Sequence, residues 1–136
     1  TTQQGTQGIC PPGWHLPVDE DWKVLNGAAD TQYGIGDPEW NKTAIRGFDA
    51  GTNLRTNYGW EPPNDGNDYF GFSGLPAGIV NPDGVSFLEL LYAYWWTSTM
   101  YNNDKSWYQY LNYNSPDVSR LHSENGYAFS VRCIKN

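Results

Sequence analysis

Two cysteines lie near opposite ends of this 136-residue chain, and the sequence holds no third one. Cys10 and Cys133 therefore predict one disulfide that joins the two ends of a domain, in an oxidising compartment. In the chain-entropy model, closing a loop of roughly 120 residues stabilises the folded state by about 4 to 5 kcal/mol. The alternative is a pair of buried, reduced thiols in a cytosolic protein, because free cysteine is also commonly buried.

Aromatic residues dominate the apolar part of the sequence, with seven Trp, ten Tyr and five Phe. We expect a core built largely from aromatic rings, whose polar tips need partners. Fifteen Gly and nine Pro indicate many tight turns and a loop-rich fold. A chain of this length forms one domain. We expect residues 9–136 to form it and residues 1–8 to be a polar lead-in, as in a fragment of a larger exported protein.

The formal net charge of −7 argues against nucleic acid as a partner, because phosphate neutralisation needs clustered Lys and Arg. The same charge argues against an anionic membrane surface. No apolar run approaches the roughly 20 residues that span a bilayer, so we expect no membrane insertion. The start of the sequence shows no signal peptide and is polar.

One helix is predicted with its start near Asp19, which we expect to be the N-cap. Trp22, Leu25 and either Ala28 or Ala29 share one face of this helix, and we expect it to end near Ala29. A short second helix or a turn is predicted within residues 37–47, because Pro38 stands early in that segment.

The second half of the chain predicts strands. Residues 59–84 are dominated by Gly, Pro, Asn and Asp and indicate long ordered loops, and residues 86–93 indicate a helical turn that leads into a strand at 94–99. Three further strands, at 107–114, 118–121 and 127–133, are separated by turn signals. We expect an antiparallel meander, and with one good helix the fold class is α+β.

Along residues 107–114, we expect side chains to alternate between the two faces of a strand. Trp107, Gln109, Leu111 and Tyr113 lie on one, and Tyr108, Tyr110, Asn112 and Asn114 lie on the other, as in a half-exposed strand. In the final strand we expect Tyr127, Phe129, Val131 and Cys133 to alternate inward. The residues assigned to the core are Trp14, Trp22, Trp95, Trp96, Trp107, Phe129 and Val131.

Six motifs occur in a fixed order along the chain. They are Cys-Pro-Pro-Gly-Trp-His-Leu-Pro (10–17), Asp-Ala-Gly-Thr-Asn-Leu-Arg (49–55), Gly-Trp (59–60), Phe-Gly-Phe-Ser-Gly-Leu-Pro (70–76), Tyr-Trp-Trp-Thr-Ser-Thr (94–99) and Phe-Ser-Val-Arg-Cys (129–133). This series resembles the Fibrobacter succinogenes major paralogous domain family. The resemblance implies a C-type lectin-like domain with one or two short helices packed on a small antiparallel sheet. It also implies secreted or surface-attached bacterial proteins, in which the domain is often a binding module.

The segment Glu61-Pro-Pro-Asn64 resembles the Glu-Pro-Asn signature of calcium-dependent lectins, but it carries an extra Pro. We therefore expect a proline-stiffened loop and no cofactor. The alternative is an oxygen-only calcium site. Its candidate ligands are Asp65, Asn67, Asp68 and Asp83.

Catalytic chemistry is not expected. His15 and His122 are far apart in the sequence, too few ligands accompany them for zinc, and no nucleophile-elbow pattern is present. Formylglycine-generating enzymes have a related fold, as the resemblance implies, but they need reactive cysteine thiols. A disulfide between Cys10 and Cys133 would remove those thiols.

The candidate binding surface lies between residues 101 and 123. Tyr gives rigid contact area, and Asn and Ser give adaptable hydrogen bonds, as in the binding loops of antibodies. The candidate ligand-binding residues are Tyr101, Asn102, Asn103, Asp104, Tyr108, Tyr110, Asn112, Asn114, Asp117, Ser119 and His122.

These residues favour a non-catalytic extracellular module that recognises a glycan or a protein. One alternative is a structural subunit or domain of a surface filament or secreted assembly, which docks neighbouring subunits. Another, which the resemblance implies, is a variable ligand-display protein of a diversity-generating retroelement. A further alternative is that this face is simply solvated or packs on a missing segment.

Overall fold

The computed structural model describes residues 5–136, and it has α+β structure that is mostly β. The longest strands are β5 (Tyr92–Met100), β6 (Lys105–Asn112) and β7 (Val118–Glu124), which pair antiparallel in sequence order. Strand β2 (Ala44–Arg46) extends this sheet beyond β7. The predicted meander is therefore confirmed for its first three strands.

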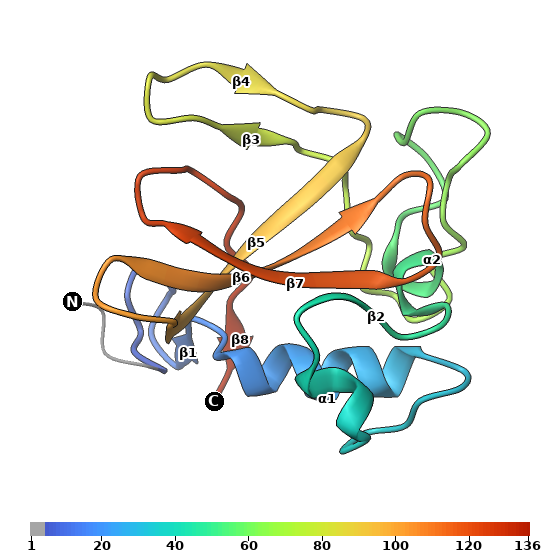
Figure 1. Cartoon of the computed structure of the whole chain (residues 1–136), viewed down its shortest axis with the longest axis horizontal. Coiled ribbons are helices and arrows are strands. Elements are labelled where there is room, and N and C mark those ends of the chain that lie inside the picture. Colours follow the sequence, from blue (N-terminus) through green and yellow to red (C-terminus); the bar gives the residue numbers. More distant parts are fainter. Residues whose placement is uncertain (1–4) are drawn as a thin grey trace.

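Helix α1 (Asp19–Ala29) runs beneath one face of the sheet, as Figure 1 shows. It is followed by η1 (Pro38–Asn41), a 3₁₀ turn that confirms the short second element. A further helix, α2 (Ala50–Leu54), was not predicted. Its Gly51 lies so close to the β6–β7 turn that an added Cβ would stand 1.9 Å from the carbonyl oxygen of Asp117.

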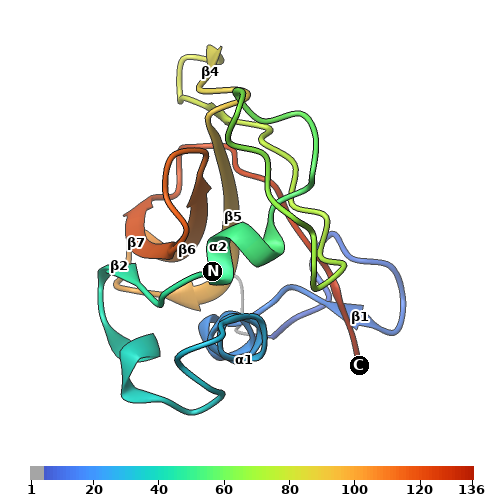
Figure 2. The ribbon, with the colours of Figure 1, turned by 90° about the vertical axis from the view of Figure 1, so that its right-hand side faces the viewer.

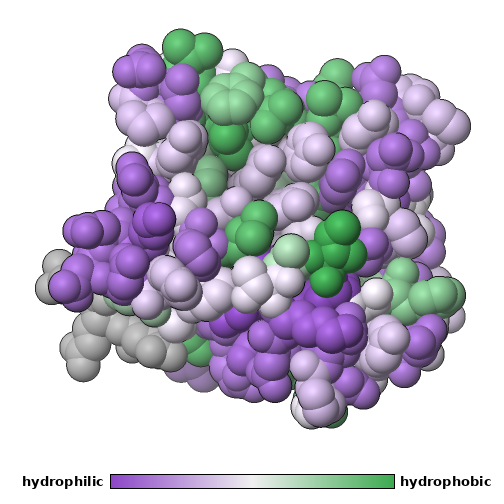
Figure 3. All heavy atoms as spheres, in the orientation of Figure 1, coloured by the Kyte–Doolittle hydropathy of each residue, from purple (hydrophilic) through white to green (hydrophobic). Residues whose placement is uncertain are grey.

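Two short strand pairs complete the described part of the chain. Strand β1 (Trp14–His15) pairs with β8 (Ile134–Lys135), and β3 (Ile79–Val80) pairs with β4 (Ser86–Phe87). The β3–β4 hairpin lies on the side of the large sheet away from α1 (Figure 1). Figure 3 shows hydrophobic residues gathered near this hairpin and hydrophilic residues over the helical layer.

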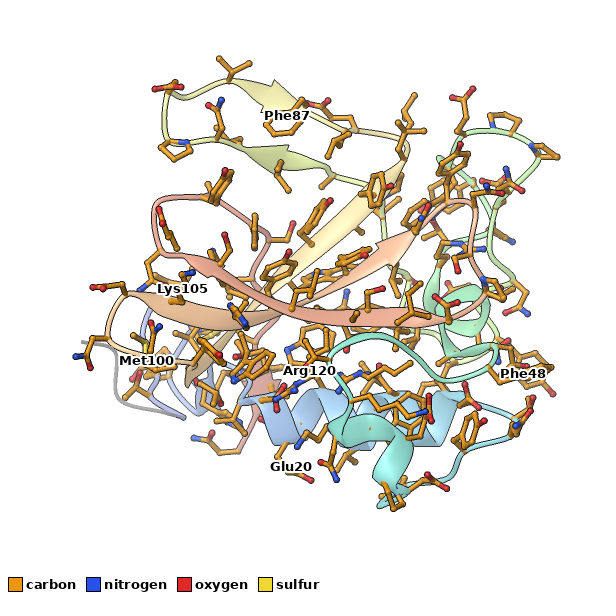
Figure 4. All side chains as sticks on the ribbon, viewed as in Figure 1. Glu20, Phe48, Phe87, Met100, Lys105 and Arg120 are labelled. Atoms are coloured by element: carbon orange, nitrogen blue, oxygen red, sulfur yellow. A yellow bond between two sulfur atoms is a disulfide. The ribbon has the colours of Figure 1, made fainter. Side chains whose placement is uncertain are left out.

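The start of α1 differs from the prediction. Val18 is the N-cap, and its backbone N–H donates to the Asp21 carboxylate at 2.8 Å. Asp19 is the first helical residue, and its carboxylate accepts two 2.7 Å hydrogen bonds from the guanidinium of Arg120. Figure 4 shows Arg120 in the space between β7 and the helical layer. Asp19 therefore fixes the helix to the sheet, and it does not cap the helix.

Two predicted elements are wrong. Residues 86–93 form no helical turn, because Leu88 and Leu90 have positive φ values of 64° and 67°, which a right-handed helix excludes. Residues 127–133 form no continuous strand. Instead, Ala128 bridges to β3 and Ser130 bridges to β5 in parallel, so this segment crosses between the two.

The core differs from the predicted set in part. Trp22 and Trp95 are 3% and 5% exposed, as predicted, whereas Trp14 is 37% exposed and does not belong to the core. Trp40 and Trp60 are buried and were not predicted. The remaining predicted members are half-buried, namely Trp96, Trp107, Phe129 and Val131.

The disulfide between Cys10 and Cys133 is present, so the reduced-thiol alternative is wrong. It joins the loop before β1 to the residue before β8, at a Cα–Cα distance of 5.8 Å. The two ends of the described chain are therefore tied together beside α1. Within residues 5–136, no helix has the length and apolar character needed to cross a bilayer.

Candidate functional site

The face of the sheet away from α1 carries a continuous set of aromatic rings. Alternation along β5 and β6 places these side chains on one face, and the segment after β7 adds two more. Neighbouring ring centroids lie 4.3 to 6.2 Å apart. We call this set the aromatic face, and it consists of Tyr92, Tyr94, Trp96, Tyr108, Tyr110, Tyr127 and Phe129.

Phe129 is the centre of this packing. Its ring stacks on the ring of Trp96, with a centroid distance of 4.3 Å. The centroid distances from Phe129 to Tyr94 and Tyr108 are 5.2 and 4.9 Å. The ring spacings fall within the range in which aromatic pairs attract one another. The rings therefore support each other in a fixed arrangement and form a preorganised surface.

Every ring of the aromatic face is half-buried, so each keeps some surface open to solvent. No tyrosine hydroxyl in the set is both fully buried and unpaired within the described residues. Burial raises the pKa of Tyr94 and of Tyr108, and neighbouring tyrosines raise both further. These hydroxyls therefore stay neutral and can both donate and accept hydrogen bonds.

A cleft of about 440 Å³ opens at one end of the aromatic face. Trp96 belongs to both the aromatic face and the cleft. Met100 and Ser106 also line the cleft, which therefore lies at the end of β5 and β6 where the turn joins them. Figure 4 labels Met100 and Lys105 at this end. Asn103 and Asn125 supply amides to the lining, and Ile9, Leu16 and Val131 supply apolar surface. The volume lies within the usual range for small-ligand sites.

The first group of predicted residues lies in the β5–β6 turn. Tyr101 stacks on His122 at 3.6 Å between ring centroids, and Asn103 lines the cleft. The Asn102 side chain accepts hydrogen bonds from the backbone of Asp104 and Lys105, so it shapes the turn. Asp104 is exposed.

The second group lies at the other end of β6 and does not join the first. Asn112 accepts a hydrogen bond from the backbone N–H of Asn114 and so shapes the β6–β7 turn. Asp117 lies in the same turn beside α2. Ser119 is 3% exposed, so its side chain offers almost no surface to a ligand. The structure therefore divides the predicted surface between the two faces of the sheet. Tyr108 and Tyr110 lie on the aromatic face, whereas His122 pairs with Trp107 and lies, with Tyr101 stacked on it, on the opposite face.

The structure adds residues that the sequence had placed elsewhere. Trp96 and Phe129 were assigned to the core, and Tyr92 and Tyr94 were not singled out. The alternation of Tyr92, Tyr94 and Trp96 along the sequence is a signal that places the three side chains on one face of a strand. In the structure they pair across β5–β6 with Asn112, Tyr110 and Tyr108, respectively. The contribution of Phe129 had no such signal, because its segment is not a regular strand.

Two of the candidate calcium ligands, Asp65 and Asp68, already accept local hydrogen bonds. Asp68 accepts hydrogen bonds from the backbone and hydroxyl of Ser73, and Asp65 accepts one from the backbone of Trp60. Asp83 lies in the β3–β4 turn. Among residues 5–136, no group of three His, Cys, Asp or Glu side chains is placed to hold a metal ion.

Comparison with known proteins gives one match. The family model of the Fibrobacter succinogenes major domain matches residues 1–135. Searches of curated proteins and of solved structures each found no match. Because the family model covers nearly the whole chain, the chain belongs to the Fibrobacter succinogenes major domain family.

Proposed function

We propose that this domain is a non-catalytic, extracellular ligand-binding module that recognises a glycan through the aromatic face and the adjoining cleft. The observation that carries the proposal is the set of half-buried rings that ends in a 440 Å³ cleft with two amides. Flat rings pack against the apolar faces of sugars. Asn103 and Asn125 can donate and accept hydrogen bonds at sugar hydroxyls.

Charge narrows the class of glycan. The chain carries a net charge of −7, and no titratable side chain lines the cleft among the described residues. An acidic glycan would be repelled by the whole domain. A neutral glycan is therefore the preferred ligand, and a protein ligand is the competing class.

The fold and location belong to the same proposal. We take the domain to have the C-type lectin-like fold that its motifs suggest, in a secreted or cell-surface protein. The disulfide supports an oxidising compartment. The two other functions considered, a structural subunit and a variable ligand-display protein, stay predictions from the sequence.

A glycan array followed by calorimetry tests the proposal. The variant with Tyr108→Ala and Tyr110→Ala should weaken binding of the best neutral glycan about 30-fold, if each ring contributes about 1 kcal/mol. The variant with Tyr108→Phe and Tyr110→Phe keeps the rings and loses only the hydrogen bonds of the hydroxyl groups. Its affinity should therefore lie between that of the natural chain and that of the alanine variant. Each variant must first unfold cooperatively in urea.

The matched control changes two tyrosines outside the aromatic face. Tyr58 and Tyr69 are 61% and 86% exposed on loops, so Tyr58→Ala with Tyr69→Ala should leave the affinity unchanged. Equal losses in both alanine pairs, or unchanged binding in a folded Tyr108 and Tyr110 variant, would refute the site.

A further inference from the structure

A second cavity lies beside α1 and shares no lining residue with the cleft. It has a volume of about 250 Å³. Figure 2 shows the C-terminal segment passing next to α1, with β1 on its outer side. The residues that line the cavity come from these three elements, from Pro17 between β1 and α1, and from the loop that carries Phe72.

The walls of this cavity are mostly apolar. Trp22 and Phe72 contact each other edge to face at 5.9 Å, and Trp14, Leu25 and Ile134 add further apolar surface. The indole N–H of Trp22 is buried and has no acceptor within the described residues. A buried donor without a partner destabilises the fold unless an acceptor reaches it.

Two cations line the same cavity. The Arg132 guanidinium lies 4.5 Å from the centroid of the Phe72 ring, and Lys135 stands two residues later. Both are exposed, and neither forms an ion pair within residues 5–136.

Most other cations of the chain have protein partners. Lys23, Lys42 and Arg120 form ion pairs with carboxylates. Arg46 and Arg55 donate to backbone carbonyl oxygens. Among the described cationic side chains other than Arg132 and Lys135, only Lys105 has neither kind of partner, and it lies on β6.

The acidic side chain at the cavity interacts with residues other than these two cations. Among the described lining residues Asp21 is the one acid. Its carboxylate accepts the N–H of Val18 at 2.8 Å and lies 3.5 Å from Nε2 of His15. Asp21 forms no ion pair with Arg132 or Lys135, so the two cations have no carboxylate partner within the described residues, in a chain whose net charge is −7.

We propose that this cavity binds a small carboxylate with an apolar body. The carboxylate interacts with Arg132 and Lys135, and the apolar body packs against Trp22 and Phe72. The volume exceeds the roughly 150 Å³ that holds a benzene molecule, so one ring with a short chain fits. A free acid and the C-terminus of a peptide that ends in an aromatic residue present this same chemistry.

Titration of the whole chain with 3-phenylpropionate tests the proposal, followed by ¹H–¹⁵N spectra. The neutral amide, 3-phenylpropanamide, has the same shape without the charge. We expect the acid to bind at least tenfold more tightly and to shift the indole N–H of Trp22. Absence of binding, or equal binding of acid and amide, would overturn the proposal. Acetyl-Gly-Phe and its C-terminal amide form a second pair, and tighter binding of this peptide acid than of 3-phenylpropionate identifies a peptide C-terminus as the source.

The matched variants are Lys135→Gln and Lys105→Gln, which change the net charge equally. Lys135→Gln should weaken binding of 3-phenylpropionate at least threefold, and Lys105→Gln should leave it unchanged. Arg132→Gln should weaken it more, because Arg offers two parallel hydrogen bonds to a carboxylate. If Lys105→Gln and Lys135→Gln weaken binding equally, the effect is one of overall charge and the site is wrong.

Discussion

A single carboxylate, that of Asp30, organises the chain between α1 and α2. It accepts hydrogen bonds from the backbone N–H groups of Gln32 and Tyr33 on one side, and from those of residues 48–50 on the other. Burial raises the pKa of Asp30, but these backbone hydrogen bonds, that from Phe48 first, lower it more. The net pKa is therefore below the ordinary value.

Asp30→Asn should lower the free energy of unfolding by about 1 to 3 kcal/mol at pH 7, because the amide keeps one accepting oxygen and replaces the other with an NH₂ group, which cannot accept backbone N–H bonds. A carboxylate with a lowered pKa stabilises the fold fully above its unfolded pKa of about 3.9, and that stabilisation disappears as the pH falls through the folded value. Urea unfolding at several pH values between 6 and about 2 should thus show a smaller acid-induced loss in Asp30→Asn. Asp83→Asn, in the β3–β4 turn, is the control and should behave like the natural chain.

At the scale of elements, α2 is fixed by close backbone approach to the β6–β7 turn. The backbone N–H of Thr52 donates to the carbonyl of Pro116 at 3.0 Å, and Gly51 leaves no room for a side chain against Asp117. The helix therefore holds the end of the sheet that is opposite the cleft.

Gly51→Ala should destabilise the domain by about 1 to 3 kcal/mol or more, because the added methyl group meets backbone that cannot move alone. Gly34→Ala is the matched control, since a Cβ there meets nothing within 4 Å. Its unfolding free energy should stay within about 0.5 kcal/mol of the natural chain. Thermal and urea unfolding measure both, and equal effects would contradict this account of α2.

The sequence predicted the elements that have a regular hydrophobic period. Helix α1 and strands β5 to β7 carry that period, and the structure has them. Helix α2 has only five residues and depends on contacts with a distant turn, so local pattern does not reveal it. The candidate site was predicted in part for the same reason: Tyr108 and Tyr110 follow strand alternation, whereas Phe129 and Asn125 reach the site through long-range folding.

At the scale of the whole molecule, the disulfide between Cys10 and Cys133 closes a loop with a sequence separation of 123. It ties the segment before β1 to the segment that supplies Phe129 and Arg132. Val131 lines the cleft and Cys133 lines the second cavity. The disulfide therefore helps to position residues of both candidate sites.

Replacement of both cysteines by serine should lower the free energy of unfolding by about 4 to 5 kcal/mol, because the unfolded chain regains the entropy of an open loop. Urea unfolding of the variant and of the natural chain, with and without a reductant, measures this loss. The reductant should shift the midpoint of the natural chain and leave that of the variant unchanged.

We propose that the aromatic face and its cleft bind a neutral glycan, and this binding can be measured directly. The direct measurement is a titration of the isotope-labelled domain with the strongest neutral glycan from the array, followed by aromatic ¹H–¹³C and amide ¹H–¹⁵N spectra. We expect the largest shifts at Trp96, Tyr108, Tyr110 and Asn103. Saturable binding with its largest shifts elsewhere, or no saturable binding of any neutral glycan, would contradict it.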